Sequence, residues 1–230
     1  MRRLVLALLA TAAFTQVASA ADLPAKVYTK APAMVAPAYN WTGLYIGING
    51  GGAWGKTGWT YVAAGTTADH NTSGGLVGGT LGYNWQMNNI VLGLEGDWDW
   101  ANISGSTTCP NPAFTCNSKL TSLGTLRARL GFAAWDRALL YVTGGWAWGN
   151  NNINTVSAAT GTVGTSTTRS GGTFGLGAEF ALWDNWTGKV EWLNYNLGTG
   201  TYTVDTALQV NASTKGNLLR AGLNYRFGGL

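Results

Sequence analysis

The chain has 230 residues, which is enough for one domain of ordinary size. Charged residues make up 10% of it, against about 25% in typical soluble proteins, while glycine numbers 34 and tryptophan 12. The 14 basic residues are spread along the sequence without a basic patch, which argues against nucleic acid as a partner.

The first twenty residues are predicted to be a secretory signal peptide. Arg2 and Arg3 supply a positive start, residues 4–14 form an apolar core, and residues 18–20 (Ala-Ser-Ala) offer a cleavage site. We therefore expect an exported protein whose mature form begins at Ala21. Without the two arginines, 12 basic residues face 10 acidic ones, so the mature net charge is about +2.

Residues 21–40 are predicted to be a Pro/Ala-rich periplasmic tether. Three of the five prolines lie here, and proline cannot donate a hydrogen bond to a strand. After the signal peptide, no apolar run approaches the roughly 20 residues that a membrane helix needs. The folded domain is expected over residues 41–230.

Eight segments of this domain alternate apolar residues with polar or small ones, the pattern of β-strands with two unlike faces. They lie at residues 41–54, 74–86, 90–100, 119–132, 139–149, 171–182, 186–195 and 217–227. Each has roughly ten residues, which is the length a tilted strand needs to cross a bilayer.

The connections between these segments alternate in length. Short ones are expected near 87–89, 134–138 and 183–185, and long ones near 55–72, 101–118, 150–168 and 198–214. Outer-membrane barrels place short turns in the periplasm and long loops outside. The pattern therefore predicts an all-β protein, an eight-stranded antiparallel up-and-down transmembrane β-barrel with periplasmic termini.

The charges of the expected strands all lie on one face. We assign five acidic and five basic residues of this polar face to the lumen, namely Glu95, Asp97, Asp99, Arg127, Arg129, Glu179, Lys189, Glu191, Arg220 and Arg226. A narrow closed lumen needs near neutrality, because an unpaired charge removed from water costs several kcal/mol. We therefore predict a lumen charge network, with the apolar face toward lipid. A soluble lipocalin-like barrel would have the opposite facing.

Tryptophans gather at the expected strand ends. Beside the long loops stand Trp54, Trp98, Trp100, Trp146 and Trp148, and beside the short turns or the tether stand Trp41, Trp85, Trp135, Trp183 and Trp186. Indole side chains prefer the two membrane interfaces, so these residues are predicted to form two interfacial aromatic girdles.

In aggregate, these segments resemble a known family. AADLP, WTGLYIGINGG, VLGLEGDWDW, LGTLRARLGFA, KVEWLNYNLG and LRAGLNYRF are similar to the alphaproteobacterial small outer-membrane immunogenic proteins, the RopB-type proteins of the "porin family". The resemblance implies an eight-stranded, surface-exposed and often antigenic outer-membrane barrel, with haemin binding in some members. Such barrels commonly end on an aromatic residue that the barrel assembly machinery recognises, whereas here Phe227 is followed by Gly228-Gly229-Leu230.

Two motifs invite a catalytic or nucleotide-binding interpretation. GGGAWGKT at residues 50–57 fits the phosphate-loop pattern, but no helical period follows it and an outer loop is expected there, so we interpret it as chance. The acid row of Glu95, Asp97 and Asp99 resembles a glycosidase pair or a calcium site. Basic residues expected on the neighbouring strand favour an ion network instead.

The only cysteines, Cys109 and Cys116, lie in one expected loop of an exported chain, which predicts a disulfide. His70, the only histidine, is expected to be a solvated loop residue, with a ligand role such as haem binding as the alternative. We predict no metal site and no cofactor.

The sequence therefore predicts a structural, surface-exposed outer-membrane barrel without catalytic activity, which supports envelope integrity and displays its loops. The alternatives are a narrow porin-like channel for ions or small solutes, a loop-mediated receptor or adhesin, and a soluble periplasmic carrier. The expected partners are outer-membrane lipid, the barrel assembly machinery and an extracellular ligand at the loops. The oligomeric state is left open.

Overall fold

The computed structural model describes residues 39–109, 111–159, 161–205 and 208–228. The predicted signal peptide and residues 21–38 of the predicted tether lie outside these ranges. The described chain forms eight strands: β1 (Gly43–Tyr61), β2 (Thr67–Met87), β3 (Ile90–Thr108), β4 (Thr115–Trp135), β5 (Ala138–Ser157), β6 (Gly161–Trp183), β7 (Trp186–Asp205) and β8 (Leu208–Phe227). No described helix is long and apolar enough to cross a membrane.

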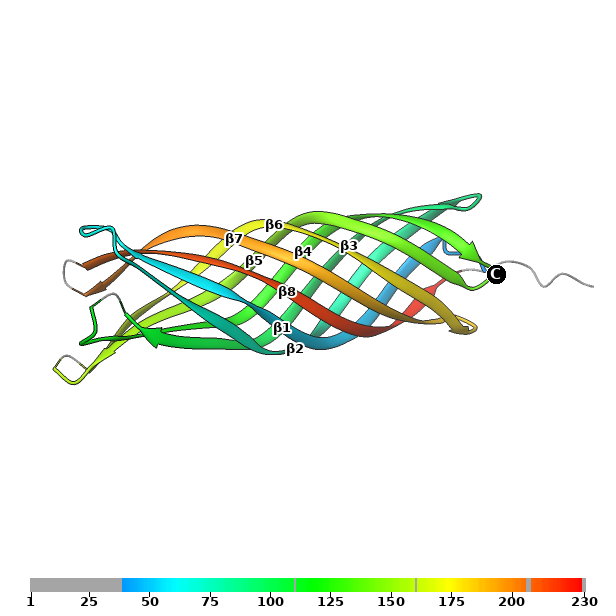
Figure 1. Ribbon diagram of the computed structural model, residues 1–230. Coiled ribbons are helices and arrows are strands. Elements are labelled where there is room, and N and C mark those ends of the chain that lie inside the picture. Colours follow the sequence, from blue (N-terminus) through cyan, green and yellow to red (C-terminus); the bar gives the residue numbers. More distant parts are fainter. Residues whose placement is uncertain (1–38, 110, 160, 206–207, 229–230) are drawn as a thin grey trace, which may run out of the picture. The chain divides into compact units, whose positions relative to one another are not determined.

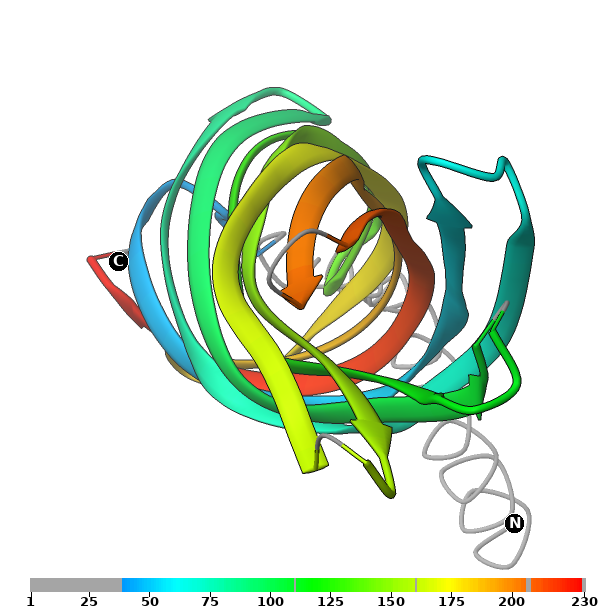
Figure 2. The same cartoon turned by 90° about the vertical axis from the view of Figure 1, so that its left-hand side faces the viewer.

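The strands close into a barrel in sequence order, and every neighbouring pair is antiparallel (Figures 1 and 2). β1 closes the ring because it pairs with both β2 and β8: Ile46 lies opposite Leu81 on one side and Tyr225 on the other. The ring is paired all round in its half nearer the termini, as a segment in hydrocarbon requires. Toward the opposite rim, the β2–β3 pairing ends at Ser73 and Ser104, and the β6–β7 pairing ends at Gly172 and Asn196. The predicted fold class is confirmed.

The short connections are two-residue turns at 88–89, 136–137 and 184–185. Asn88 and Asp184 have positive φ angles of 55° and 40°. Asn and Asp tolerate this left-handed region better than most residues, because their short polar side chains hydrogen-bond locally. These turns occupy the rim of the barrel at which β1 begins and β8 ends.

The predicted long loops are wrong in one respect: most of their residues continue the strands. The strands have 19 to 23 residues instead of about ten. The described residues that remain between strands at the outer rim are 62–66, 109, 111–114 and 158–159. Residues 50–57 therefore lie inside β1, where a phosphate loop cannot form. The Ser/Thr/Asn-rich composition misled the prediction, because a neighbouring strand on one or both sides supplies the backbone hydrogen bonds that weak strand formers need.

The barrel is taller than a membrane. A strand of about 20 residues rising about 3.3 Å per residue and tilted by about 40° spans roughly 50 Å, whereas the apolar band of an outer-membrane barrel is about 25 Å tall. The extra length lies at the rim opposite the termini, beyond the outer tryptophans. The hairpins at that rim therefore stand outside the membrane.

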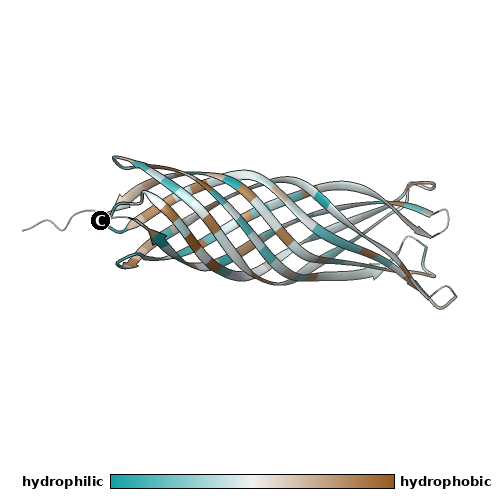
Figure 3. Ribbon diagram, turned by 180° about the vertical axis from the view of Figure 1, so that it is seen from behind, coloured by the Kyte–Doolittle hydropathy of each residue, from teal (hydrophilic) through white to brown (hydrophobic). Residues whose placement is uncertain are grey.

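The two faces of the strands differ sharply. Leu94 is 64% exposed on the outer wall, and its neighbour Glu95 is 0% exposed in the interior. We call the outward residues between the two tryptophan levels the apolar belt; it contains Leu44, Ile46, Ile48, Val77, Leu81, Leu92, Leu94, Leu126, Leu130, Val142, Phe174, Leu176, Val190 and Leu219, all exposed. In Figure 3, hydrophobic positions are most frequent over the half of the barrel nearer the C-terminus.

Candidate functional site

The interior of the barrel is occupied by a network of ion pairs whose members come from β3, β4, β6, β7 and β8. Arg127 on β4 lies at its centre. Its guanidinium donates to Glu95, to Asp97 at 2.8 Å and to Glu191 at 2.7 Å. Thr125 accepts a further hydrogen bond from Arg127 Nε. The register places Glu95 directly opposite Arg127, so the pairing of β3 with β4 builds this contact.

Arg220 on β8 extends the network across the lumen. It contacts Asp97 at 2.9 Å, Asp99 at 3.0 Å and Glu191 at 2.8 Å. β8 and β3 are separated by β1 and β2 in the ring, so these contacts cross the bore instead of following the sheet. One arginine thus ties together opposite walls of the barrel.

Arg129 sits in an aromatic cradle. Its guanidinium lies 3.8 Å from the ring centre of Tyr141 and donates to the Tyr45 hydroxyl at 2.7 Å and to Glu179 at 2.8 Å. Tyr45 in turn donates to Glu95 at 2.8 Å. Each cradle tyrosine lies over a glycine of the neighbouring strand.

Those glycines are Gly82 beneath Tyr45 and Gly177 beneath Tyr141. A Cβ atom at either glycine would collide with the end of the tyrosine ring. The tyrosines are participants that the sequence analysis missed. Both tyrosines occupy positions of the alternating pattern that face inward, and both lie beside a glycine of the next strand. This combination is the signal that could have identified them.

Glu95 is the most heavily shared carboxylate. Besides Arg127 and Tyr45, it accepts from Lys189 at 2.9 Å and lies 3.4 Å from Arg129. At the periplasmic side, Glu179 also accepts from Thr187 and from the Asn224 amide at 2.9 Å. Nearly every carboxylate oxygen of the network therefore has a donor, as buried charge requires.

Arg226 does not join this network, contrary to the sequence-based prediction. Its side chain is buried, but it donates to the Thr42 carbonyl at 3.3 Å and lies 4.3 Å from the Tyr39 ring centre. None of the ion pairs among the described residues includes it. The network therefore consists of five acids and four bases. The alternation of residues along a strand predicts whether a side chain faces the lumen or the outer wall. It does not predict the level along the barrel axis at which that side chain lies, because the strands are tilted.

Apolar layers close the lumen on both sides of the network. On the periplasmic side lie Trp41, Val91, Leu139, Tyr141 and Ala181. On the outer side lies a plug that contains Ala53, Leu76, Ile103, Leu120, Leu123, Ala147, Leu193, Tyr195, Leu197 and Leu218. Leu123 of this plug is the register partner of Asp99, so the plug begins where the ions end.

Beyond the plug, the lumen is polar again and then apolar. A void of about 10 Å³ is lined by residues that include Thr57, Asn151 and Thr214. Farther out, a third apolar layer contains Trp59, Cys109, Cys116, Ile153, Tyr202, Val210 and Ala212. Ionic, apolar and polar layers of side chains thus follow one another along the described interior, as the narrow width of an eight-stranded barrel permits.

His70 is not a solvated loop residue, contrary to the sequence-based prediction. It lies on the inner face of β2 and is buried, with Nε2 2.6 Å from the Ser118 hydroxyl, which donates to Thr57 at 3.3 Å. The extension of β2 beyond the membrane turns this residue into the lumen. No described group of three or more His, Cys, Asp and Glu side chains is arranged to hold a metal ion.

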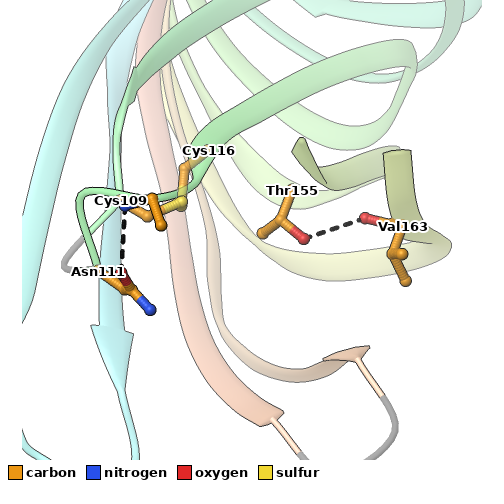
Figure 4. Close-up of a disulfide and its surroundings, with 6 residues drawn as sticks. Cys109, Asn111, Cys116, Thr155 and Val163 are labelled. Carbon is orange, nitrogen blue, oxygen red and sulfur yellow. Dashed lines mark hydrogen bonds between the residues drawn. A yellow bond between two sulfur atoms is a disulfide. The ribbon is translucent and has the colours of Figure 1, made fainter. Parts of the chain in front are cut away.

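Cys109 and Cys116 are joined by a disulfide with a Cα–Cα distance of 5.1 Å. It links the end of β3 to the start of β4 and clamps the intervening turn (Figure 4). The Cys109 amide also donates to the Phe114 carbonyl at 2.9 Å. The turn is therefore fixed at its base by one covalent and one hydrogen bond.

The ten tryptophans predicted to form the girdles divide into three groups. Trp54, Trp85, Trp98, Trp100, Trp135, Trp146 and Trp183 are exposed on the outer wall. Trp148 and Trp186 are half-buried, and Trp186 packs edge-on against Tyr225. The assignment of Trp41 to a girdle is wrong. Trp41 precedes β1, its buried side chain lies on the inner face, and it closes the periplasmic end of the lumen. The Trp41 amide donates to the Gln86 side chain at 2.6 Å.

Comparisons with known proteins agree with this architecture. The sequence model of the family described as "Outer membrane protein beta-barrel domain" matches residues 6–227. The 31 kDa outer-membrane immunogenic protein of Brucella melitensis biotype 1 is 35% identical over 242 residues, covering 99% of this chain and 100% of that protein.

Two further relatives extend the comparison. The 25 kDa outer-membrane immunogenic protein of Brucella abortus biovar 1 is 30% identical, covering 99% of both chains. The 22 kDa outer membrane protein of Rhizobium leguminosarum bv. viciae is 30% identical, covering 85% of this chain and 82% of that one. The predicted resemblance and outer-membrane localisation are confirmed, and the chain belongs to the family of outer membrane protein β-barrel domains that includes the Brucella immunogenic proteins.

Proposed function

We propose that this protein is a structural, non-conducting and non-catalytic barrel of the outer membrane that displays its outer hairpins at the cell surface. The observation that carries the proposal is the filled lumen: an ion network held between apolar layers that leave no wide path for solute. A pore would need a continuous polar route, and the plug around Leu123 and Leu193 interrupts it. The narrow-channel alternative is therefore less well supported.

The acid row does not favour catalysis. A general acid or base must be within reach of a substrate proton. Glu95, Asp97 and Asp99 are buried and already bound by arginine or lysine side chains, beneath the plug. Their arrangement supports a role in joining strands that are not neighbours in the sheet.

Display is supported by the height of the barrel. Outward residues beyond the outer tryptophans are polar, for example Asn102, Ser104 and Ser106 on β3, and they carry exposed side chains. The disulfide at Cys109 and Cys116 holds one hairpin in shape. Rigid polar hairpins outside the membrane are the surface that relatives named as immunogenic would present.

Surface protection in intact cells tests this proposal. A protease site inserted at the outer turn 158–160 should be cut in intact cells, whereas the same site at the opposite turn 184–185 should be cut only after lysis. In a deletion strain, wild type and a variant with shortened outer hairpins should restore detergent resistance equally. Restoration by wild type alone would contradict the proposal that the barrel itself supports the envelope, because the outer hairpins would then be required.

A further inference from the structure

Two lysines of the outer wall stand directly opposite each other, just beyond the outer tryptophans. Lys56 on β1 and Lys215 on β8 are register partners, and both side chains are exposed. Like charges directly opposite each other destabilise a sheet. None of the ion pairs formed by the described residues includes either lysine. The pair therefore has no carboxylate within ion-pair distance among the described residues.

Amide side chains continue the row on both sides. Asn71 on β2 is the register partner of Lys56, and Asn196 on β7 is the register partner of Lys215. The next row toward the membrane contains Ser73, Trp54, Asn217 and Asn194 in the same strand order. Together these two rows line a groove of about 630 Å³ on the outer wall, whose lining contains no carboxylate.

The chemistry of this groove fits an anion. The Asn194 amide already donates to the Gly216 carbonyl and to the Asn217 side-chain oxygen. The two ammonium groups and the other amides of the groove are further hydrogen-bond donors, and a phosphate offers oxygen acceptors for them. Asp69, an acid on the same face of β2, lies opposite Gly58 and outside the lining of the groove. The site thus presents positive charge without an acid of its own to neutralise it.

The height of the groove indicates where the anion comes from. Trp54 belongs both to the groove and to the outer tryptophan level, so the lysines lie where the head groups of the outer leaflet begin. Gly52 and Gly75 are register partners in the row directly below. A Cβ atom at either glycine would meet no atom nearer than 3.7 Å, so the wall there is smooth and open.

Gly79 continues this smooth strip into the apolar belt, beside the exposed side chains of Ile48 and Val77. We propose that the groove binds a phosphate-bearing lipid of the outer leaflet. The phosphate lies between Lys56 and Lys215 with the asparagine amides beside it, and an acyl chain follows the glycine strip. A free phosphate ion would use the lysines but not the strip, which is why the lipid is the favoured occupant. The proposal does not depend on whether the lumen conducts.

Native mass spectrometry of the purified full-length protein in detergent tests the site. The probes are bisphosphorylated lipid A, the same lipid after dephosphorylation, and inorganic phosphate as a competitor. Wild type is expected to retain the bisphosphorylated lipid at least about tenfold more tightly than the dephosphorylated one, because a hydrogen bond to a charged group is worth about a factor of ten or more. Inorganic phosphate should not displace the lipid.

Matched variants locate the binding. Lys56→Gln should weaken lipid binding, and the double variant Lys56→Gln/Lys215→Gln should weaken it by about tenfold or more, whereas the arginine variant Lys56→Arg/Lys215→Arg should retain it. Lys119→Gln is the control, because this exposed lysine on β4 lies opposite Ser104 and outside the groove. Folding of each variant is checked by its mobility on a detergent gel before and after boiling.

Several results would overturn the proposal. Unchanged affinity in the folded double glutamine variant, or an equal loss in Lys119→Gln, would remove the site from the groove. Equal retention of the dephosphorylated lipid would remove the phosphate from the interaction, and this comparison needs no variant at all. Displacement by millimolar inorganic phosphate would assign a free-anion site and reject the lipid.

Discussion

Arg220 on β8 binds Asp97 on β3 at 2.9 Å across the lumen, although two strands separate them in the sheet. The same guanidinium reaches Asp99 and Glu191. Replacing a whole buried ionic group by apolar residues is often neutral, but removing one partner leaves the others as uncompensated buried charges. Arg220 is therefore needed for stability, because its removal would leave the carboxylates that it binds without their counter-charge.

Arg220→Met should lower the free energy of unfolding by about 3–5 kcal/mol. Urea unfolding in lipid vesicles, followed by tryptophan fluorescence, measures this loss. Arg226→Met is the matched control, because Arg226 is equally buried but contacts a carbonyl and an aromatic ring instead of a carboxylate. Equal losses in the two variants would show that the ion pairs contribute nothing specific.

Gly82→Ala should destabilise the barrel by about 1–3 kcal/mol, because the added methyl group collides with the Tyr45 ring and pushes it away from Arg129. Gly79→Ala, three residues earlier on the same strand, adds its methyl group on the open outer wall and should be almost neutral. The same unfolding titration compares the two. Similar stabilities would mean that the cradle can shift without loss.

Leu94→Arg should impair membrane insertion, because an arginine on the lipid face costs about 2–4 kcal/mol near the midplane. Ser106→Arg, on the same strand and the same outward face but beyond Trp100, should insert like wild type. The folded fraction recovered in vesicles, read from the boiling-dependent gel mobility, is the measurement. A normal yield of Leu94→Arg would contradict the assignment of the apolar belt.

Replacing both cysteines of the Cys109–Cys116 disulfide by serine should loosen the hairpin without unfolding the barrel. In the chain-entropy description, closing a loop of this size stabilises by about 2.5 kcal/mol at most, and the bridge lies at one outer turn. Limited proteolysis should therefore cut the 109–116 region faster, with an unchanged resistant core. Reduced wild type should behave like the double variant, and loss of the core in either would assign the bridge a global role.

The alternation of side chains predicted the strand number, the order of the ring and the facing of Leu94 and Glu95, because a period of two places residues on faces regardless of detail. It did not predict the level along the barrel axis at which each inward side chain lies. Arg226 has the correct face, yet it lies near Tyr39 and Thr42, away from the carboxylates, because the tilt and stagger of the strands set which residues share a level.

The outer half of the barrel escaped prediction for a different reason. Segments such as NNNINTVS have weak strand propensity, and they are strands because both neighbours supply hydrogen bonds along the ladder. His70 was consequently expected in solvent and is found in the lumen. Trp41 was assigned to a girdle by its position in the chain, although it shares the inward parity of Tyr45.

The central claim is that the interior is filled by its own ions and apolar plug. Single-channel recording in planar bilayers tests it directly, with insertion of folded protein verified independently. We predict that the current stays at the leak level of the bare bilayer at any salt concentration. Steady, reproducible conductance steps that grow with salt would contradict the account.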